Sequence, residues 1–272
     1  MNEIDIPVAG GTLRALEWPG DGPVVLAAHG ITANAASWAP VAAALAGRVR
    51  LVAPDLRGRA GSAGLPEPYG MAAHAADLIA VADHLGVSRM HLVGHSMGGF
   101  VVTATAARHP SRVASVLLVD GGVPLGLPPG MDVDTALLAT IGPAMQRLSM
   151  TFPDVETYLD FFRGNPALGR YWSADIETYV RRDWTGTGSS CRLDAVRTDA
   201  TDMLTRPAPH AFPLLWAPRG LQDEEGGLYE QGRLSGLDAE LVPDVNHYTI
   251  LLGGGASRVA GRILSLVLSP PR

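Results

Sequence analysis

Apolar and polar residues follow two periods along this chain, and each period predicts a different kind of element. Short apolar runs without a polar break are typical of strands buried on both faces of a parallel sheet. Runs rich in β-formers and bounded by glycine or proline are also typical of strands. These patterns predict strands at 4–8, 12–18, 24–28, 50–53, 90–93, 113–119, 213–216 and 239–242.

Helical periodicity separates most of these strands. Apolar residues at helical spacing, followed by stop signals such as Gly86, predict helices at 38–46, 69–85, 98–108 and 257–268. On the second of these helices, we expect His74, His84, Asp77 and Asp83 to face solvent. Strands that alternate with helices form βαβ units. The expected fold class is therefore α/β, with a mostly parallel twisted sheet and helices on both of its faces.

The alternation stops after Gly122 and resumes at residue 213. The segment 122–206 contains no convincing buried strand and predicts several helices, among them 133–150, 155–163 and 174–182. A segment of roughly 85 residues is too long for a loop. We therefore expect one α/β core, formed by residues 1–121 and 207–272, that is interrupted by a helical cap insertion at 122–206.

Composition excludes several classes of protein. The chain has 272 residues, of which 47% are hydrophobic and 18% charged, and its net charge is −6. This apolar content argues against a disordered chain, and the mildly acidic charge argues against a nucleic-acid partner. The apolar run at 263–268 is too short to span a membrane. No basic and apolar leader opens the sequence, so a cytoplasmic location is expected.

Two residue types narrow the chemistry further. Cys191 is the only cysteine, so neither an intrachain disulfide nor a cysteine metal site is expected. The chain contains no lysine, because every basic residue is arginine or histidine. Schiff-base, pyridoxal-phosphate and P-loop chemistry all require lysine. The sequence therefore implies no cofactor and no metal.

The strongest local motif is Gly-His-Ser-Met-Gly at 94–98. It matches G-x-S-x-G and lies between a predicted strand and a predicted helix, which is the context of a nucleophile elbow. Side chains on such a sharp turn would clash with its neighbours, and Gly94, Gly98 and Gly99 leave the room that it needs. The alternative is a glycine-rich turn with an incidental serine. We interpret Ser96 as a nucleophile.

A serine nucleophile needs a base. His247 follows the strand at 239–242, in a loop at the carboxyl edge of the sheet, where sites assemble in such folds. Six of the other histidines lie on a predicted helix, inside a strand, beside the serine, at a helix end or in the linker around His210. We therefore choose His247, with a surface-loop histidine as the alternative reading.

The order of these motifs resembles that of the α/β-hydrolase fold superfamily. The likeness rests on His29-Gly30, on DLRG at 55–58, on GHSMGG at 94–99, on an acid and on a late histidine. It covers nearly the whole chain and places residues 122–206 at the position of the superfamily's cap. The segment 55–62 is similar to the family's D-x-R-G-x-G-x-S motif, although Ala60 stands where glycine is usual, and we interpret the segment as structural.

The resemblance also implies an anion hole and a reaction class. The backbone N–H groups of Ile31 and Met97 would hold a developing oxyanion. Serine at the elbow separates this chain from relatives that carry aspartate or cysteine there. The expected chemistry is acyl transfer to water through an acyl-enzyme.

The acid that supports His247 has two candidates. Asp223 follows the strand at 213–216 and stands where most members of the superfamily place the acid. Asp120 ends the strand at 113–119, a position that some members use. We prefer Asp223, although it lies well past the end of its strand.

The predicted function is that of a serine esterase, which cleaves a small apolar carboxylic ester or lactone. Half of the aromatic residues lie in the insertion, where they could line an apolar pocket or simply form the insertion's core: Phe152, Tyr158, Phe161, Phe162, Tyr171, Trp172, Tyr179 and Trp184. Alternatives are a C–C bond hydrolase or cofactor-free haloperoxidase of the same fold, and a ligand receptor with a vestigial triad. The sequence leaves the natural substrate and the oligomeric state open.

Overall fold

The computed structural model describes residues 1–124, 130–205 and 212–268. Its strands form one eight-stranded sheet in the order β1-β2-β4-β3-β5-β6-β7-β8. The first two are β1 (Asn2–Val8) and β2 (Gly11–Trp18), and they pair antiparallel, as do β2 and β4. The others pair parallel and are β3 (Val24–Ala28), β4 (Arg50–Pro54), β5 (Met90–His95), β6 (Val113–Val119), β7 (Leu214–Trp216) and β8 (Ala239–Leu241).

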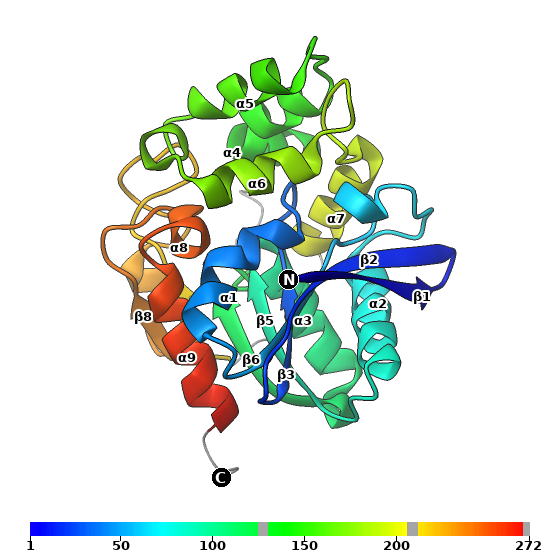
Figure 1. Ribbon diagram of the computed structural model, residues 1–272. Helices are drawn as coiled ribbons and strands as arrows, with labels where there is room; N and C mark the ends of the chain where they lie inside the picture. Colours follow the sequence, from blue (N-terminus) through cyan, green and yellow to red (C-terminus); the bar gives the residue numbers. More distant parts are fainter. Residues whose placement is uncertain (125–129, 206–211, 269–272) are drawn as a thin grey trace.

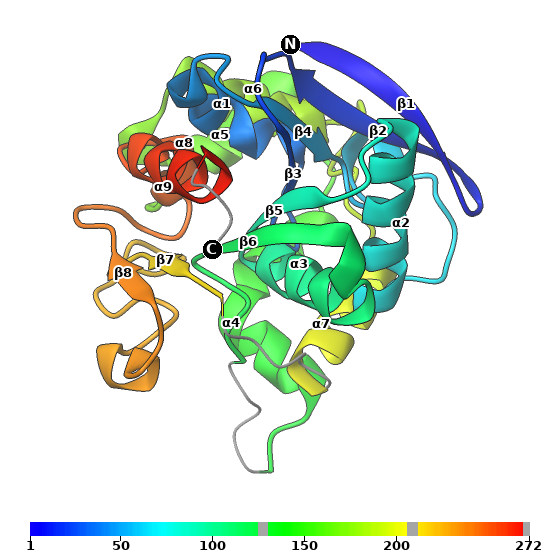
Figure 2. The same ribbon diagram turned by 90° about the horizontal axis from the view of Figure 1, so that it is seen from below.

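Helices cover both faces of this sheet (Figures 1 and 2). On one face lie α1 (Ala39–Leu45), α8 (Thr249–Leu252) and α9 (Ala256–Leu268), and on the other lie α2 (Met71–His84) and α3 (Met97–Arg108). Each face of the sheet packs against its helices to form one hydrophobic core. Side chains alternate between the two cores along a strand: in β6, Leu117 and Val119 belong to the core under α1, α8 and α9, and Val116 and Leu118 to the core under α2 and α3. The predicted α/β class and mostly parallel sheet are confirmed.

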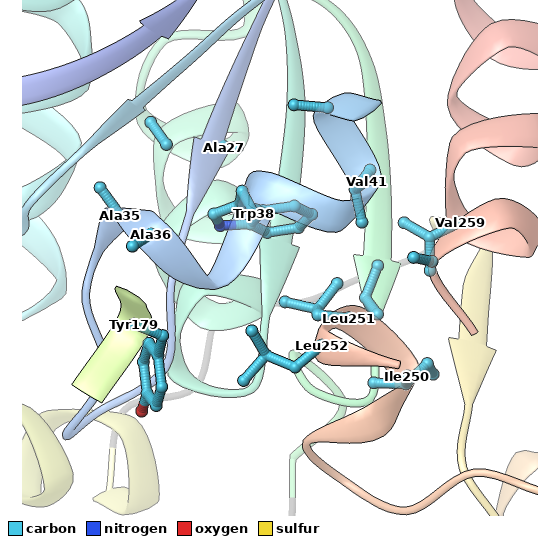
Figure 3. Close-up of a cluster of buried hydrophobic side chains, with 14 of the residues drawn as sticks. Ala27, Ala35, Ala36, Trp38, Val41, Tyr179, Ile250, Leu251, Leu252 and Val259 are labelled. Carbon is cyan, nitrogen blue, oxygen red and sulfur yellow. The ribbon is translucent and has the colours of Figure 1, made fainter. Parts of the chain in front are cut away.

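Figure 3 shows part of the first core. Trp38 is fully buried there, between Ala27 of β3 and the alkyl side chains of Leu251 and Val259. The helix predicted at 38–46 occurs as α1 at Ala39–Leu45, and a separate 3-10 turn at Ala35–Trp38 precedes it.

In the described part of the chain between β6 and β7, four α-helices lie across the carboxyl ends of the strands (Figure 1). They are α4 (Val133–Leu148), α5 (Val155–Arg163), α6 (Ala174–Asp183) and α7 (Leu193–Thr205), and we call them the cap helices. The division at 122–206 stays a prediction, and its second boundary and His210 lie outside the described residues.

Ion pairs tie the cap helices to the core. Arg182 of α6 reaches the fully buried Asp55 at 2.7 Å, at the end of β4. Burial raises the pKa of the Asp55 carboxyl despite this guanidinium. Asp199 of α7 lies 2.5 Å from Arg59 and 3.0 Å from His74. The two contacts join parts of the chain that are far apart in sequence.

The expectation that the polar side chains of α2 face solvent was wrong for two residues. His74 is fully buried against Asp199 of the cap, and Asp77 is buried against Arg57 at 2.6 Å. Both lie on the side of α2 that meets charged partners from other segments. Asp83 is exposed, as predicted, and pairs with Arg112.

Candidate active site

Ser96 occupies a strained turn between β5 and α3. Its backbone has φ 55° and ψ −123°, outside the regions that side chains usually adopt. Three glycines allow neighbouring backbone segments to approach this turn closely. A Cβ atom added at any of them would lie only 2.1 Å from a backbone carbonyl oxygen. The clash would be with Gly98 for a Cβ at Gly94, with Ala28 for a Cβ at Gly98, and with Ser96 for a Cβ at Gly121. The turn therefore has the geometry of a nucleophile elbow.

His247 follows β8 and is buried in the loop before α8. Its Nδ1 lies 2.6 Å from Oδ2 of Asp120, which ends β6. The other Asp120 oxygen accepts the N–H of Ala217 at 3.1 Å. Since an ionised carboxylate only accepts hydrogen bonds, His247 Nδ1 carries the hydrogen and Nε2 keeps its lone pair.

The loop of His247 is held from two further sides. The His247 N–H donates to the carbonyl oxygen of Arg219 at 3.1 Å. The carbonyl oxygen of His247 lies 2.8 Å from Nε2 of His95, and the two rings stack with centroids 4.6 Å apart. Burial lowers the pKa of His95 well below its ordinary value. His95 therefore stays neutral and donates through Nε2.

The preference for Asp223 as the partner of His247 was wrong. Its carboxylate accepts instead from Arg219 at 2.8 Å, from Arg170 at 2.7 Å and from the amide of Asn246 at 3.0 Å. Although burial raises the pKa of Asp223, these hydrogen bonds bring it below the ordinary value. The long loop after β7 carries Asp223 past the imidazole, while Asp120, the alternative, ends the strand beside it.

The two residues expected to supply the oxyanion hole, Ile31 and Met97, line the same cavity as Ser96. Met97 is the first residue of α3, so the helix provides no acceptor for its N–H. Ile31 follows the His29-Gly30 pair after β3. His29 is fully buried, its Nδ1 lies 2.8 Å from the carbonyl oxygen of Gly30, and its Nε2 accepts the N–H of Leu56 at 2.9 Å. Burial lowers the pKa of His29 to about 3, so it remains neutral and holds this turn.

A cavity joins these groups beneath the cap helices. Its walls include Ser96, His247, Ile31 and Met97 from the core. From the cap helices come Ala136, Leu137, Thr140, Ile141 and Ala144 of α4, Tyr179 of α6, and Met203 and Leu204 of α7. Of the aromatic residues that could line a pocket or form the insertion's core, Tyr179 does both, since it lines this cavity and packs in the core cluster that also buries Phe152, Tyr158 and Phe162. The residues of α4 were not predicted to line the cavity. Their spacing alone would have indicated only a buried helix face.

The remaining sequence expectations concern metal ligands, membrane-spanning helices and Cys191. Within residues 1–124, 130–205 and 212–268, no group of three His, Cys, Asp or Glu side chains could hold a metal ion. In the same residues, no helix is both long and apolar enough to cross a membrane. Cys191 is free and buried.

Comparison with known proteins identifies the family. The model of the alpha/beta hydrolase fold matches residues 23–193, which is more than half of the chain. This chain therefore belongs to the α/β-hydrolase fold family.

Curated relatives resemble only part of the chain. A putative carbamate hydrolase RutD of Caulobacter segnis is 40% identical over 107 residues, which are 38% of this chain and 40% of that protein. An uncharacterised protein of Mycobacterium tuberculosis is 38% identical over 112 residues, 41% of this chain and 33% of that protein. The chain thus matches two fifths or less of the length of these relatives.

Solved structures show the fold over the whole chain. That of E-2-(acetamidomethylene)succinate hydrolase superimposes with a TM-score of 0.77 at 22% identity, over 98% of this chain and 99% of that one. A thioesterase domain from the curacin biosynthetic pathway gives a TM-score of 0.70 at 24% identity, over 97% and 99% of the two chains.

Proposed function

We propose that this α/β-hydrolase is a serine hydrolase that cleaves a small apolar carboxylic ester or lactone through an acyl-enzyme. The observation that carries the proposal is the joint placement of three groups. Ser96 stands on a strained elbow in the wall of a cavity, His247 lines the same cavity, and Asp120 lies 2.6 Å from the far nitrogen of that imidazole. These are a nucleophile, a base and a group that orients the base.

The reaction begins with proton transfer. Nε2 of His247 takes the proton of the Ser96 hydroxyl while Oγ attacks the carbonyl carbon. The N–H groups of Ile31 and Met97 hold the oxyanion, and such donors are commonly worth about 3 kcal/mol each. His247 then protonates the leaving alcohol. Water, activated by the same imidazole, hydrolyses the acyl-enzyme.

The surroundings of His247 suit this cycle. The carboxylate of Asp120 stabilises the imidazolium that forms in each half-reaction. His95 stays neutral against the same ring, so no second cation opposes that charge. The α4 side chains that line the cavity are mostly alkyl, which favours an apolar acyl or alcohol group.

The test combines a probe, a panel and one variant. A fluorophosphonate should label Ser96. Kinetics with p-nitrophenyl esters, lactones, carbamates and vinylogous diketones should show the highest kcat/KM for apolar esters or lactones. Ser96→Ala fits the same turn and should lose roughly 10⁴-fold or more in kcat while its circular dichroism stays unchanged.

Other outcomes identify the alternatives. Preferred cleavage of the diketone would indicate a C–C bond hydrolase, and preferred cleavage of the carbamate would indicate the reaction named for RutD. Turnover that persists in Ser96→Ala would reject the mechanism. Binding without turnover or labelling would indicate a ligand receptor.

A further inference from the structure

The described part of the cavity wall around Ser96 is uncharged. Among the described residues that line the cavity there is no Arg, Asp or Glu, and the chain has no lysine. Arg59 comes close, 3.9 Å from Sδ of the lining Met97, but its guanidinium pairs with Asp199. A substrate carboxylate that entered would lose its hydration without gaining a counter-charge, which is strongly unfavourable.

Three phenols, those of Tyr179, Tyr229 and Tyr248, interrupt this largely apolar wall, together with the hydroxyls of Thr32, Ser37 and Thr140. Tyr179 comes from α6 and Tyr248 follows His247, and both line the cavity. Neither hydroxyl makes a hydrogen bond to a described residue, although buried phenols usually find a partner. Tyr229 differs, because its hydroxyl accepts the N–H of Val123 at 3.3 Å and donates to the carbonyl oxygen of the same residue at 3.1 Å.

The hydroxyl of Tyr179 also reaches open space. The residue is only 6% exposed, yet its oxygen is not among the sealed, unbonded polar atoms of the described chain, which include Trp38 Nε1. In Figure 3 the Tyr179 hydroxyl points away from Trp38 and the alkyl side chains around it. The open space beside this residue is therefore the cavity that it lines.

Both phenols are held in place by the backbone around them. The amide of Asn34 donates to the carbonyl oxygen of Tyr179 at 2.9 Å, which fixes this turn of α6 on the core. The Tyr248 N–H donates to Oδ1 of Asn246 at 2.9 Å, and its ring packs edge-on against His247 with centroids 5.5 Å apart. Preorganised donors of this kind bind a ligand with little loss of side-chain entropy.

We propose that the hydroxyls of Tyr179 and Tyr248 form the polar subsite of this cavity. The substrate is then an uncharged ester or lactone that carries a second hydrogen-bonding oxygen, such as a keto, ether or hydroxyl group, and no carboxylate. This inference rests on the proposed function, because the subsite orients the acyl compound that Ser96 attacks. Burial raises the pKa of both phenols, so that the hydroxyls stay protonated and can donate.

The test compares four p-nitrophenyl esters of similar length: hexanoate, 5-oxohexanoate, the monoester of glutaric acid, and that monoester methylated at its free carboxyl. We expect kcat/KM to be highest for 5-oxohexanoate, and at least 100-fold lower for the free carboxylate than for its methyl ester. Tyr179→Phe and Tyr248→Phe should each lower kcat/KM for 5-oxohexanoate by roughly 3–10-fold, as expected for one neutral hydrogen bond, mainly through KM. Hexanoate hydrolysis should change less than about twofold.

Tyr229→Phe is the matched control, since its hydroxyl is already bonded to the backbone. The ratio of the two rates, 5-oxohexanoate over hexanoate, should stay unchanged in this variant. Equal losses for both esters in the Tyr179 and Tyr248 variants, or a carboxylate cleaved as fast as its methyl ester, would overturn the proposal.

A binding measurement separates this inference from the proposed function. Isothermal titration of Ser96→Ala with the primary amides of the same four acids reports the subsite without turnover. The same ranking there, in the absence of ester hydrolysis by the native protein, would support the subsite and reject the esterase function. Equal affinity for the carboxylate and keto amides would reject the subsite while leaving the esterase function intact.

Discussion

Replacing Asp120 by asparagine should reverse the hydrogen-bond polarity at the buried imidazole. The carboxylate accepts from two donors, the Ala217 N–H and His247 Nδ1. Asparagine has only one oxygen. If the asparagine oxygen still accepts the hydrogen bond from the Ala217 N–H, the asparagine NH₂ group faces Nδ1 of His247. The imidazole then carries its hydrogen on Nε2 instead. The opposite orientation would set NH₂ against the Ala217 N–H, donor against donor.

The favoured orientation leaves a base that cannot act. With a hydrogen on Nε2, His247 has no lone pair to receive the proton of Ser96, and the charge that stabilised the imidazolium is gone as well. We expect kcat to fall by roughly 10⁴. That factor corresponds to about 5 kcal/mol of activation free energy. Steady-state hydrolysis of a p-nitrophenyl ester at pH 8 measures it, and urea unfolding checks that the fold persists.

Asp223→Asn is the matched control. Asp223 contacts Arg219, Arg170 and Asn246 rather than the imidazole, so its variant keeps the tautomer. We expect about a tenfold loss in kcat at most, together with roughly 1–3 kcal/mol of lost stability from weakened charged hydrogen bonds. A 10⁴ loss in Asp223→Asn, with Asp120→Asn within tenfold of the native rate, would refute this reasoning.

Two further predictions concern stability. Arg182→Ala leaves buried Asp55 without its arginine and should cost about 3 kcal/mol in urea unfolding. Arg181→Ala removes only an exposed pair with Glu177 and should change the free energy of unfolding much less; equal losses would contradict the account of Arg182 as a tie between the cap helices and the core. His29 is neutral when folded, with a pKa of about 3, but protonates near 6.5 when unfolded. Unfolding free energy should therefore fall as the pH drops below 6.5, by up to about 1.4 kcal/mol per unit. His29→Asn should show a shallower slope between pH 7 and 5, and an unchanged slope would contradict this account.

Most elements could be predicted because their cause is local. The strands at Val24–Ala28 and Val113–Val119 and the helix at Val155–Arg163 occur where the pattern placed them. The helix at Leu193–Thr205 was not singled out. Its buried positions are Ala195, Val196, Asp199 and Ala200, so the apolar stripe is short and contains a charge.

Buried charges are invisible to such a pattern because their partners are distant in sequence. Asp199 and His74 both look like solvent-facing residues of amphipathic helices. They are buried because the cap helix α7 lies against the core and brings the two side chains within 3.0 Å of each other, beside Arg59. Only the packing of the cap on the core explains this placement.

The choice between the two acids depended on packing in the same way. Asp120 and Asp223 both follow strands that neighbour each other in the sheet, so strand order alone could not separate them. The path of the loop after β7 determines which carboxylate reaches the imidazole. Both carboxylates lie near His247, but they make different contacts. Asp120 bonds the ring, while Asp223 bonds Asn246, the preceding residue, and Arg170 of the cap segment. Asn246 in turn donates to the carbonyl oxygen of Ala167, also in the cap segment. The loop that carries His247 is therefore fixed by the core on one side and by the cap segment on the other, so the segment that forms part of the cavity wall also helps to position this imidazole.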